Sequence, residues 1–91
     1  MKLILGIVQD HDAGNVIDAL VQAEYRSTRI NTSGGFLKRG NATILVGVED
    51  DQVQDVLRII RENARPPEGG SGPQLAAGNV FVLNVARFVR M

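Results

Sequence analysis

The chain has 91 residues, of which 44% are apolar, and its ten basic and ten acidic residues give a formal net charge of zero. This length and composition predict a single globular domain spanning residues 1–91. The balanced charge argues against a nucleic-acid polymer or an anionic membrane as partner. The absence of cysteine excludes disulfides and zinc–cysteine sites. The first apolar run, residues 3–8, is too short for a signal peptide or a membrane span, so we expect a cytoplasmic protein.

The first third of the chain predicts a strand, a helix and a second strand. Residues 3–8 are apolar and partly β-branched, which is typical of a buried strand. Asp10 or Asp12 can then cap a helix. Residues 26–33 ("RSTRINTS") alternate between β-branched and polar side chains and predict a half-exposed strand. The apolar side of the helix is expected to consist of Val16, Ile17, Leu20 and Val21.

The remainder predicts a strand, a helix and a last strand. Residues 42–49 ("ATILVGVE") form the strand, and Asp50 and Asp51 are expected to cap the helix that follows. All three prolines lie in residues 66–78, which we interpret as a flexible connecting loop before a strand at 79–85. The order βαββαβ is typical of a ferredoxin-like α+β sandwich. The second helix is expected to turn Val53, Val56, Leu57 and Ile60 inward.

Two of the predicted strands carry apolar residues on both faces. Leu45 points away from its neighbours Ile44 and Val46, and Phe81 points away from Val82. Two helices can cover only one face of a four-stranded sheet, and a sheet face exposed to water usually carries polar residues. We therefore expect the second face to be buried by further copies of the chain in a homo-oligomer.

The stretch "SGGFLKRGN", residues 33–41, allows two interpretations. Glycines and asparagine tolerate the positive φ angles of a turn between antiparallel strands, so the stretch could be a connection only. Alternatively, Phe36 offers a face on which a nucleotide base can stack. Asn41 and Thr28 offer hydrogen-bonding groups for the base edge. Candidate cations for the phosphates are Arg26, Arg29, Lys38 and Arg39.

Other functional patterns are weaker. His11 stands beside aspartates, but one histidine at a helix start is more typical of a capping turn than of a metal site. The chain has no second histidine for a catalytic triad and no P-loop lysine motif. An acylphosphatase-like hydrolase needs an arginine after the first strand, where this chain has none. An RNA-binding sheet needs exposed aromatic residues, where this chain is mainly aliphatic. We therefore expect no enzymatic activity.

The stretches "IVQDHD", "TSGGFLKRGNATILVGVEDDQV" and "NVFVLNVARF" resemble the PII-like cyclic di-AMP receptor proteins over residues 3–88. The resemblance implies a ferredoxin-like fold assembled as a homotrimer, with cyclic di-AMP bound in clefts between subunits. It also implies a signalling role through a protein partner not yet identified, with no other cofactor and no metal.

The resemblance also implies which residues border the nucleotide. Phe36 and Leu37 would hold an adenine, and Thr28 and Asn41 would hydrogen-bond to it. Gly47 would let the strand backbone approach the ligand closely. The full implied set is Arg26, Thr28, Gly35, Phe36, Leu37, Asn41 and Gly47.

The chain departs from the family in residues 66–78, which are shorter and richer in proline and glycine than the corresponding loop of familiar members. Ligand contacts made by that loop are therefore not carried over. The alternative is a PII-like trimer that binds another nucleotide, or a protein-interaction module that does not bind cyclic di-AMP. The long signalling loop and the ATP-binding glycine motif of classical PII proteins are missing, which disfavours ATP and 2-oxoglutarate.

Overall fold

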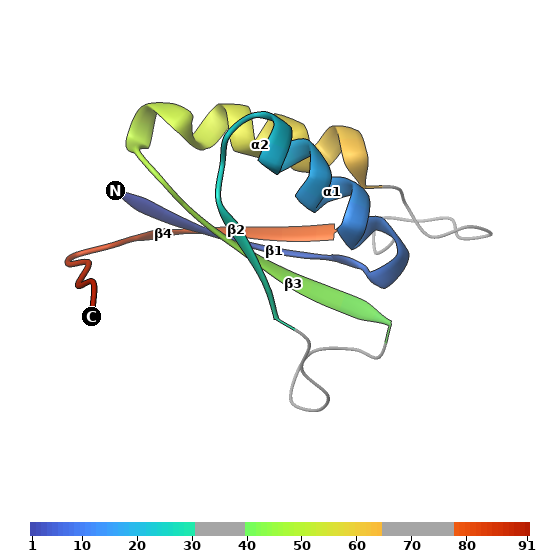
Figure 1. Ribbon diagram of the computed structural model, residues 1–91, viewed down its shortest axis with the longest axis horizontal. Coiled ribbons are helices and arrows are strands. Elements are labelled where there is room, and N and C mark those ends of the chain that lie inside the picture. Colours follow the sequence, from blue (N-terminus) through green and yellow to red (C-terminus); the bar gives the residue numbers. More distant parts are fainter. Residues whose placement is uncertain (31–39, 65–77) are drawn as a thin grey trace.

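The computed structural model describes residues 1–30, 40–64 and 78–91, which form a four-stranded sheet and two helices (Figure 1). This order confirms the predicted βαββαβ arrangement. The predicted strand residues 31–33 and the predicted loop residues 66–77 lie outside the described residues. The elements are β1 (Lys2–Gln9), α1 (Asp10–Gln22), β2 (Ser27–Ile30), β3 (Asn41–Val48), a 3-10 turn (Asp50–Gln52), α2 (Val53–Asn63) and β4 (Gly78–Asn84).

All strand pairs are antiparallel, in the order β2-β3-β1-β4. Both helices lie on the same side of the sheet (Figure 1). Because side chains alternate along a strand, the register assigns every strand residue to the helix side or to the opposite side, which we call the open face. The open face carries Leu3, Leu5, Ile7, Thr28, Ile30, Asn41, Thr43, Leu45, Gly47, Asn79, Phe81 and Leu83.

The core lies between the helices and the sheet. Val16 and Leu20 of α1 are fully buried, as predicted, and Ile17 is partly buried. Val21, predicted to face inward, is 61% exposed, so that part of the prediction was wrong. One step along a helix rotates the side chain by about 100°, which turns Val21 away from the sheet that Leu20 contacts. The largest fully buried apolar side chains are Ile4, Val8, Val16, Leu20, Ile44, Val46 and Val56.

The predicted helix caps were also wrong. Gln9 is the N-cap of α1, and the strand continues directly into the helix, so Asp10 falls in the first turn. A carboxylate there still interacts favourably with the positive end of the helix dipole. Glu49, rather than Asp50 or Asp51, precedes the second helical segment, and it forms a reciprocal capping box with Gln52.

Strand β4 has exposed apolar side chains on both of its faces. Phe81 and Leu83 on the open face are 52% and 46% exposed, and Val82 on the helix side is 45% exposed. The helix side of β4 is left uncovered because α2 packs over β1, one strand further in. Of the described helices, neither is long and apolar enough to cross a membrane.

Candidate functional site

The connection between α1 and β2 places the first two predicted ligand residues. Glu24 has a positive φ of 67°, and its N–H donates to the carbonyl of Val21, while the N–H of Tyr25 donates to that of Leu20 at 2.8 Å. These bonds satisfy carbonyls at the end of the helix and reverse the chain into the edge strand. Arg26 and Thr28, both exposed, follow immediately. A shallow hollow of about 540 Å³ there is lined by Val21, Glu24, Tyr25, Arg26, Ser27 and Thr28.

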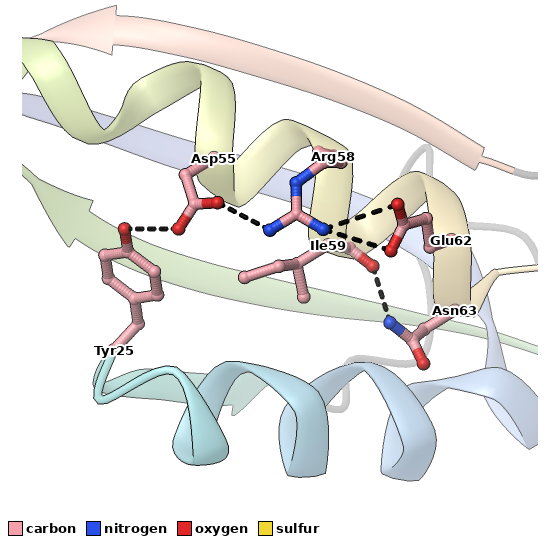
Figure 2. Close-up of polar contacts among 6 residues, drawn as sticks. All are labelled: Tyr25, Asp55, Arg58, Ile59, Glu62 and Asn63. Atoms are coloured by element: carbon pink, nitrogen blue, oxygen red, sulfur yellow. Dashed lines mark hydrogen bonds and ion pairs between the residues drawn. The ribbon is translucent and has the colours of Figure 1, made fainter.

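A chain of polar contacts fastens this hollow to α2 (Figure 2). The hydroxyl of Tyr25 donates to Asp55 at 2.8 Å, and Arg58 donates to the other oxygen of Asp55 at 2.6 Å. Arg58 also bonds to Glu62 one turn further on. The hydrogen bond from Arg58, and then that from Tyr25, lower the pKa of Asp55. The segment before Arg26 is thereby tied to the second helix.

Three of the predicted ligand residues share the open face of the sheet. Thr28 on β2 lies opposite Leu45 on β3. By strand alternation, the side chain of Asn41 and the Cα hydrogen of Gly47 that replaces a side chain face the same side as Leu45. Thr28 and Gly47 are exposed and Asn41 is half-buried. Neither of the two helices in the described residues covers this face (Figure 1).

The space around Gly47 is open. Apart from its chain neighbours, no atom of the described residues lies within 4 Å of a Cβ atom built at this position. Glycine inside a strand is less stable than alanine by roughly 0.5–1 kcal/mol, because it loses more conformational freedom on folding. The described residues give no packing reason for this cost. The packing of the described residues therefore does not require a glycine at this position.

The four predicted ligand residues that the structure describes do not close into a single pocket within one chain. Asn41 and Gly47 stand at opposite ends of β3, about 20 Å apart at the usual rise per residue. Arg26 and Thr28 lie toward the Gly47 end. The predicted contacts Gly35, Phe36 and Leu37 lie outside the described residues. The described site is thus a face along the sheet, with hydrogen-bonding groups near both ends.

The structure gives different surroundings to Arg29 and Arg26, the two candidate phosphate ligands that it describes. Lys38 and Arg39 lie outside the described residues. The side chain of Arg29 falls on the helix side of β2, opposite Ile44, and its Nη2 lies 2.5 Å from Oδ1 of Asp10. Arg26 belongs to the exposed segment that lines the hollow. The two arginines therefore have different surroundings, although the sequence presents them as equivalent cations.

Sequence analysis missed Thr43, which also lies on the open face, between Asn41 and Leu45. It is only 5% exposed, and its Oγ1 is buried with no hydrogen-bond partner among the described residues. A buried hydroxyl left without a partner lowers the stability of a fold. The period of two from Asn41 to Gly47 places Thr43 on that face from sequence alone.

The surroundings of His11 do not form a metal site. His11 Nε2 lies 3.6 Å from Oδ1 of the buried Asp12, but the described residues contain no group of three potential ligands placed to hold a metal ion.

An apolar hollow of about 370 Å³ lies between α2 and β4, away from the open face. It is lined by Val8, Leu57, Ile60, Arg61, Ala64, Gly78 and Val80.

Comparisons with known proteins identify the family. The model of the family described as cyclic-di-AMP receptor matches residues 1–69. The nitrogen fixation nifHD region GlnB-like protein 1 of Methanothermococcus thermolithotrophicus is 32% identical over 85 residues, covering 79% of this chain and 81% of the relative. A crystal structure of a functionally unknown protein from Pediococcus pentosaceus ATCC 25745 matches with a TM-score of 0.79 at 36% identity, covering 99% of this chain and 96% of that chain. These matches confirm the resemblance drawn from the sequence: the chain belongs to the cyclic-di-AMP receptor family.

Proposed function

We propose that this chain is a signalling receptor that binds cyclic di-AMP in clefts between the subunits of a homotrimer. The observation that carries the proposal is the common open face of Thr28, Asn41 and Gly47, with open space at Gly47 where a Cβ would stand. The hydroxyl of Thr28 in one subunit and the amide of Asn41 in a neighbouring subunit would supply donors and acceptors for the edge of an adenine. The missing side chain of Gly47 allows the ligand to approach the backbone.

Arg26, Phe36 and Leu37 complete the proposed contacts. Arg26 is an exposed cation beside Thr28 and would pair with a phosphate of the ligand. Phe36 and Leu37 would hold an adenine, and Gly35 would allow close approach of the backbone before them. These assignments follow from the position of each residue in the family motif.

The trimer is supported by the apolar character of the open face. Leu3, Leu5 and Leu45 are half-buried there, and Phe81 and Leu83 retain about half of their exposure. A contiguous apolar sheet face is typical of a protein–protein interface. Assembly through this face would also bring the two separated ends of the site together from different subunits. Arg26 of one subunit could then share a ligand with Asn41 of the next.

We propose that ligand state reaches a protein partner through residues 33–41 and 66–78, with no catalytic step and no metal. Two experiments address this relay and the assembly. Hydrogen exchange with and without cyclic di-AMP should show ligand-dependent protection in both segments, and protection of 33–41 alone would confine the signal to that segment. Light scattering after size exclusion should give the mass of three chains, and a monomeric mass independent of concentration would remove the shared clefts.

The decisive experiment for the ligand is calorimetric titration with cyclic di-AMP, cyclic di-GMP and ATP in parallel. We expect saturable binding of cyclic di-AMP alone. Saturable binding of another nucleotide instead would keep the receptor role and replace the ligand. The absence of all binding by a correctly assembled trimer would favour a protein-interaction module and refute the proposal.

A further inference from the structure

Three segments meet at one end of the sheet, around Asp10. The N–H of Asp10 donates to the carbonyl of Gly40 at 2.7 Å, and its Oδ1 accepts a hydrogen bond from Arg29 Nη2 at 2.5 Å. Gly40 has a φ of 91°, a conformation that favours glycine. Asp10 therefore contacts one residue before and one residue after the segment 31–39, through two different groups. We call this set of contacts the Asp10 clasp.

The position of the clasp bears directly on Asn41. Gln9, which precedes Asp10, is paired with Asn41 in the last register pair of β1 and β3. The backbone bond from Asp10 to Gly40 extends this pairing by one residue and fixes the peptide that precedes Asn41. On the other strand, Arg29 holds the last turn-side residues of β2 against the start of α1. The clasp thereby holds both strand ends that flank residues 31–39 in the sequence.

Fold stability alone is a poor explanation for the ion pair. Its partners are 34% and 55% exposed, and ion pairs with such exposure add little to the stability of a fold. Asp10 already has a favourable place in the first turn of α1, where the helix dipole stabilises a carboxylate without help from Arg29. What the pair adds is a link between two elements, β2 and α1, at the base of the proposed ligand site.

We propose that Asp10 and Arg29 are positioning residues for nucleotide binding: their ion pair holds Gly40 and the end of β2 so that Asn41 is presented to a cyclic dinucleotide. The inference rests on the proposed function, and neither residue touches the ligand. Without the ion pair, the arrangement competent for binding is a smaller fraction of the ensemble. The apparent dissociation constant rises by the inverse of that fraction.

A double-mutant cycle tests the pair. Asp10→Asn removes the carboxylate charge and keeps the backbone N–H that bonds to Gly40, and Arg29→Gln removes the cation. The control is Asp50→Asn, the same change in the 3-10 turn, which removes the exposed ion pair to Lys2 at 4.0 Å. For each trimer we would measure cyclic di-AMP affinity by calorimetry, melting temperature, and exchange of the Asp10 amide without ligand.

We expect each single variant of the pair to bind roughly 2–5-fold more weakly, with the double variant no weaker than either single one, because both break the same contact. The backbone amide of residue 10 should exchange faster in both single variants. Its exchange should be unchanged in Asp50→Asn, which should also keep wild-type affinity. Melting temperatures of the three single variants should stay close to one another.

Three results would overturn the inference. Wild-type affinity in both single variants would show that the ion pair does not position the site. Additive losses, with a far larger loss for Arg29→Gln, would show that Arg29 contacts the ligand itself. An Asp10 amide whose exchange is unchanged in both variants would show that the ion pair does not hold Gly40. If the unchanged trimer binds no cyclic dinucleotide, the proposed function fails, and the exchange result still decides whether the clasp exists.

Discussion

Replacing Gly47 by alanine should change the stability of the fold and the affinity for the ligand in opposite directions. The new Cβ would meet no atom of the chain within 4 Å, so no clash is expected in the subunit. Alanine in a strand is more stable than glycine by about 0.5–1 kcal/mol, because the unfolded chain has less freedom to lose. For a domain of this size that corresponds to a rise in melting temperature of roughly 2–8 °C.

Binding should respond in the opposite direction. If the ligand lies against the backbone of Gly47, a methyl group there imposes a steric cost of about 1–3 kcal/mol. The dissociation constant of cyclic di-AMP should then rise by about 5- to 150-fold. Gly14→Ala is the matched control: Gly14 also has no atom within 4 Å of an added Cβ, but it lies on α1. It should raise stability by up to about 1 kcal/mol and leave affinity unchanged.

The assay is calorimetry together with light scattering, because Gly47 also lies on the face proposed for assembly. A trimeric Gly47→Ala protein with unchanged affinity would refute the placement of the ligand at Gly47. A variant that dissociates into monomers would assign the open space to subunit contact instead. A marked loss of stability in a variant that stays trimeric would contradict the open surroundings described here.

Three further predictions follow from single contacts. Thr43→Val replaces a buried hydroxyl, which has no partner among the described residues, by a methyl group of similar shape. The free energy of unfolding should stay the same or rise by up to about 1 kcal/mol, as checked by thermal unfolding. Phe81→Glu puts a charge on the proposed trimer face and should reduce the mass in light scattering to that of one chain, since Phe81 is 52% exposed in the subunit. Gly78→Ala would bring a Cβ within 2.4 Å of the carbonyl oxygen of Ile7. The free energy of unfolding, measured with urea, should therefore fall by about 1–3 kcal/mol.

The pH dependence of stability can be read from Asp55. Hydrogen bonds from Arg58 and Tyr25 lower its pKa in the folded chain, so the unfolded chain binds this proton more readily. The stabilising effect of Asp55 is therefore fully present at any pH above the pKa that this aspartate has in the unfolded chain. It is lost as the pH falls through the lower pKa of the folded chain. Acid titrations of wild type and Asp55→Asn should show a stability difference at pH 6 that shrinks toward pH 2. A difference that stays constant with pH would contradict this sign.

Much of the fold was predictable because it depends on local periodicity. The period of two in β3 and the period of 3.6 in α2 each contain enough residues to specify their faces, and Val56 and Ile60 are buried as predicted. The helix caps were not predictable in this way. Whether Gln9 or Asp10 is the cap depends on how far β1 continues, and that is set by its pairing with β3 up to Asn41.

In the candidate site too, features set by local periodicity were predictable from the sequence, and contacts between different elements were not. The common face of Thr28, Asn41 and Gly47 follows from strand alternation and could be derived from sequence once the register was known. The bond from Tyr25 to Asp55 joins residues 30 apart on different elements, and no spacing in the sequence indicates it. The contact between Asp10 and Arg29 is of the same kind, since it depends on how α1 and β2 meet.

Gly47 and Phe81 are the residues of the open face that the packing of the subunit explains least. Ile44 and Val46 are apolar because they belong to the core under the helices, where they are 1% and 0% exposed. The core does not explain Gly47, where the chain would accept a side chain and gain stability from it. Nor does it explain Phe81, which keeps half of its surface in contact with water. Both residues lie on the open face. The proposed contacts from outside the subunit, a ligand near Gly47 and a second copy of the chain against Phe81, would explain both.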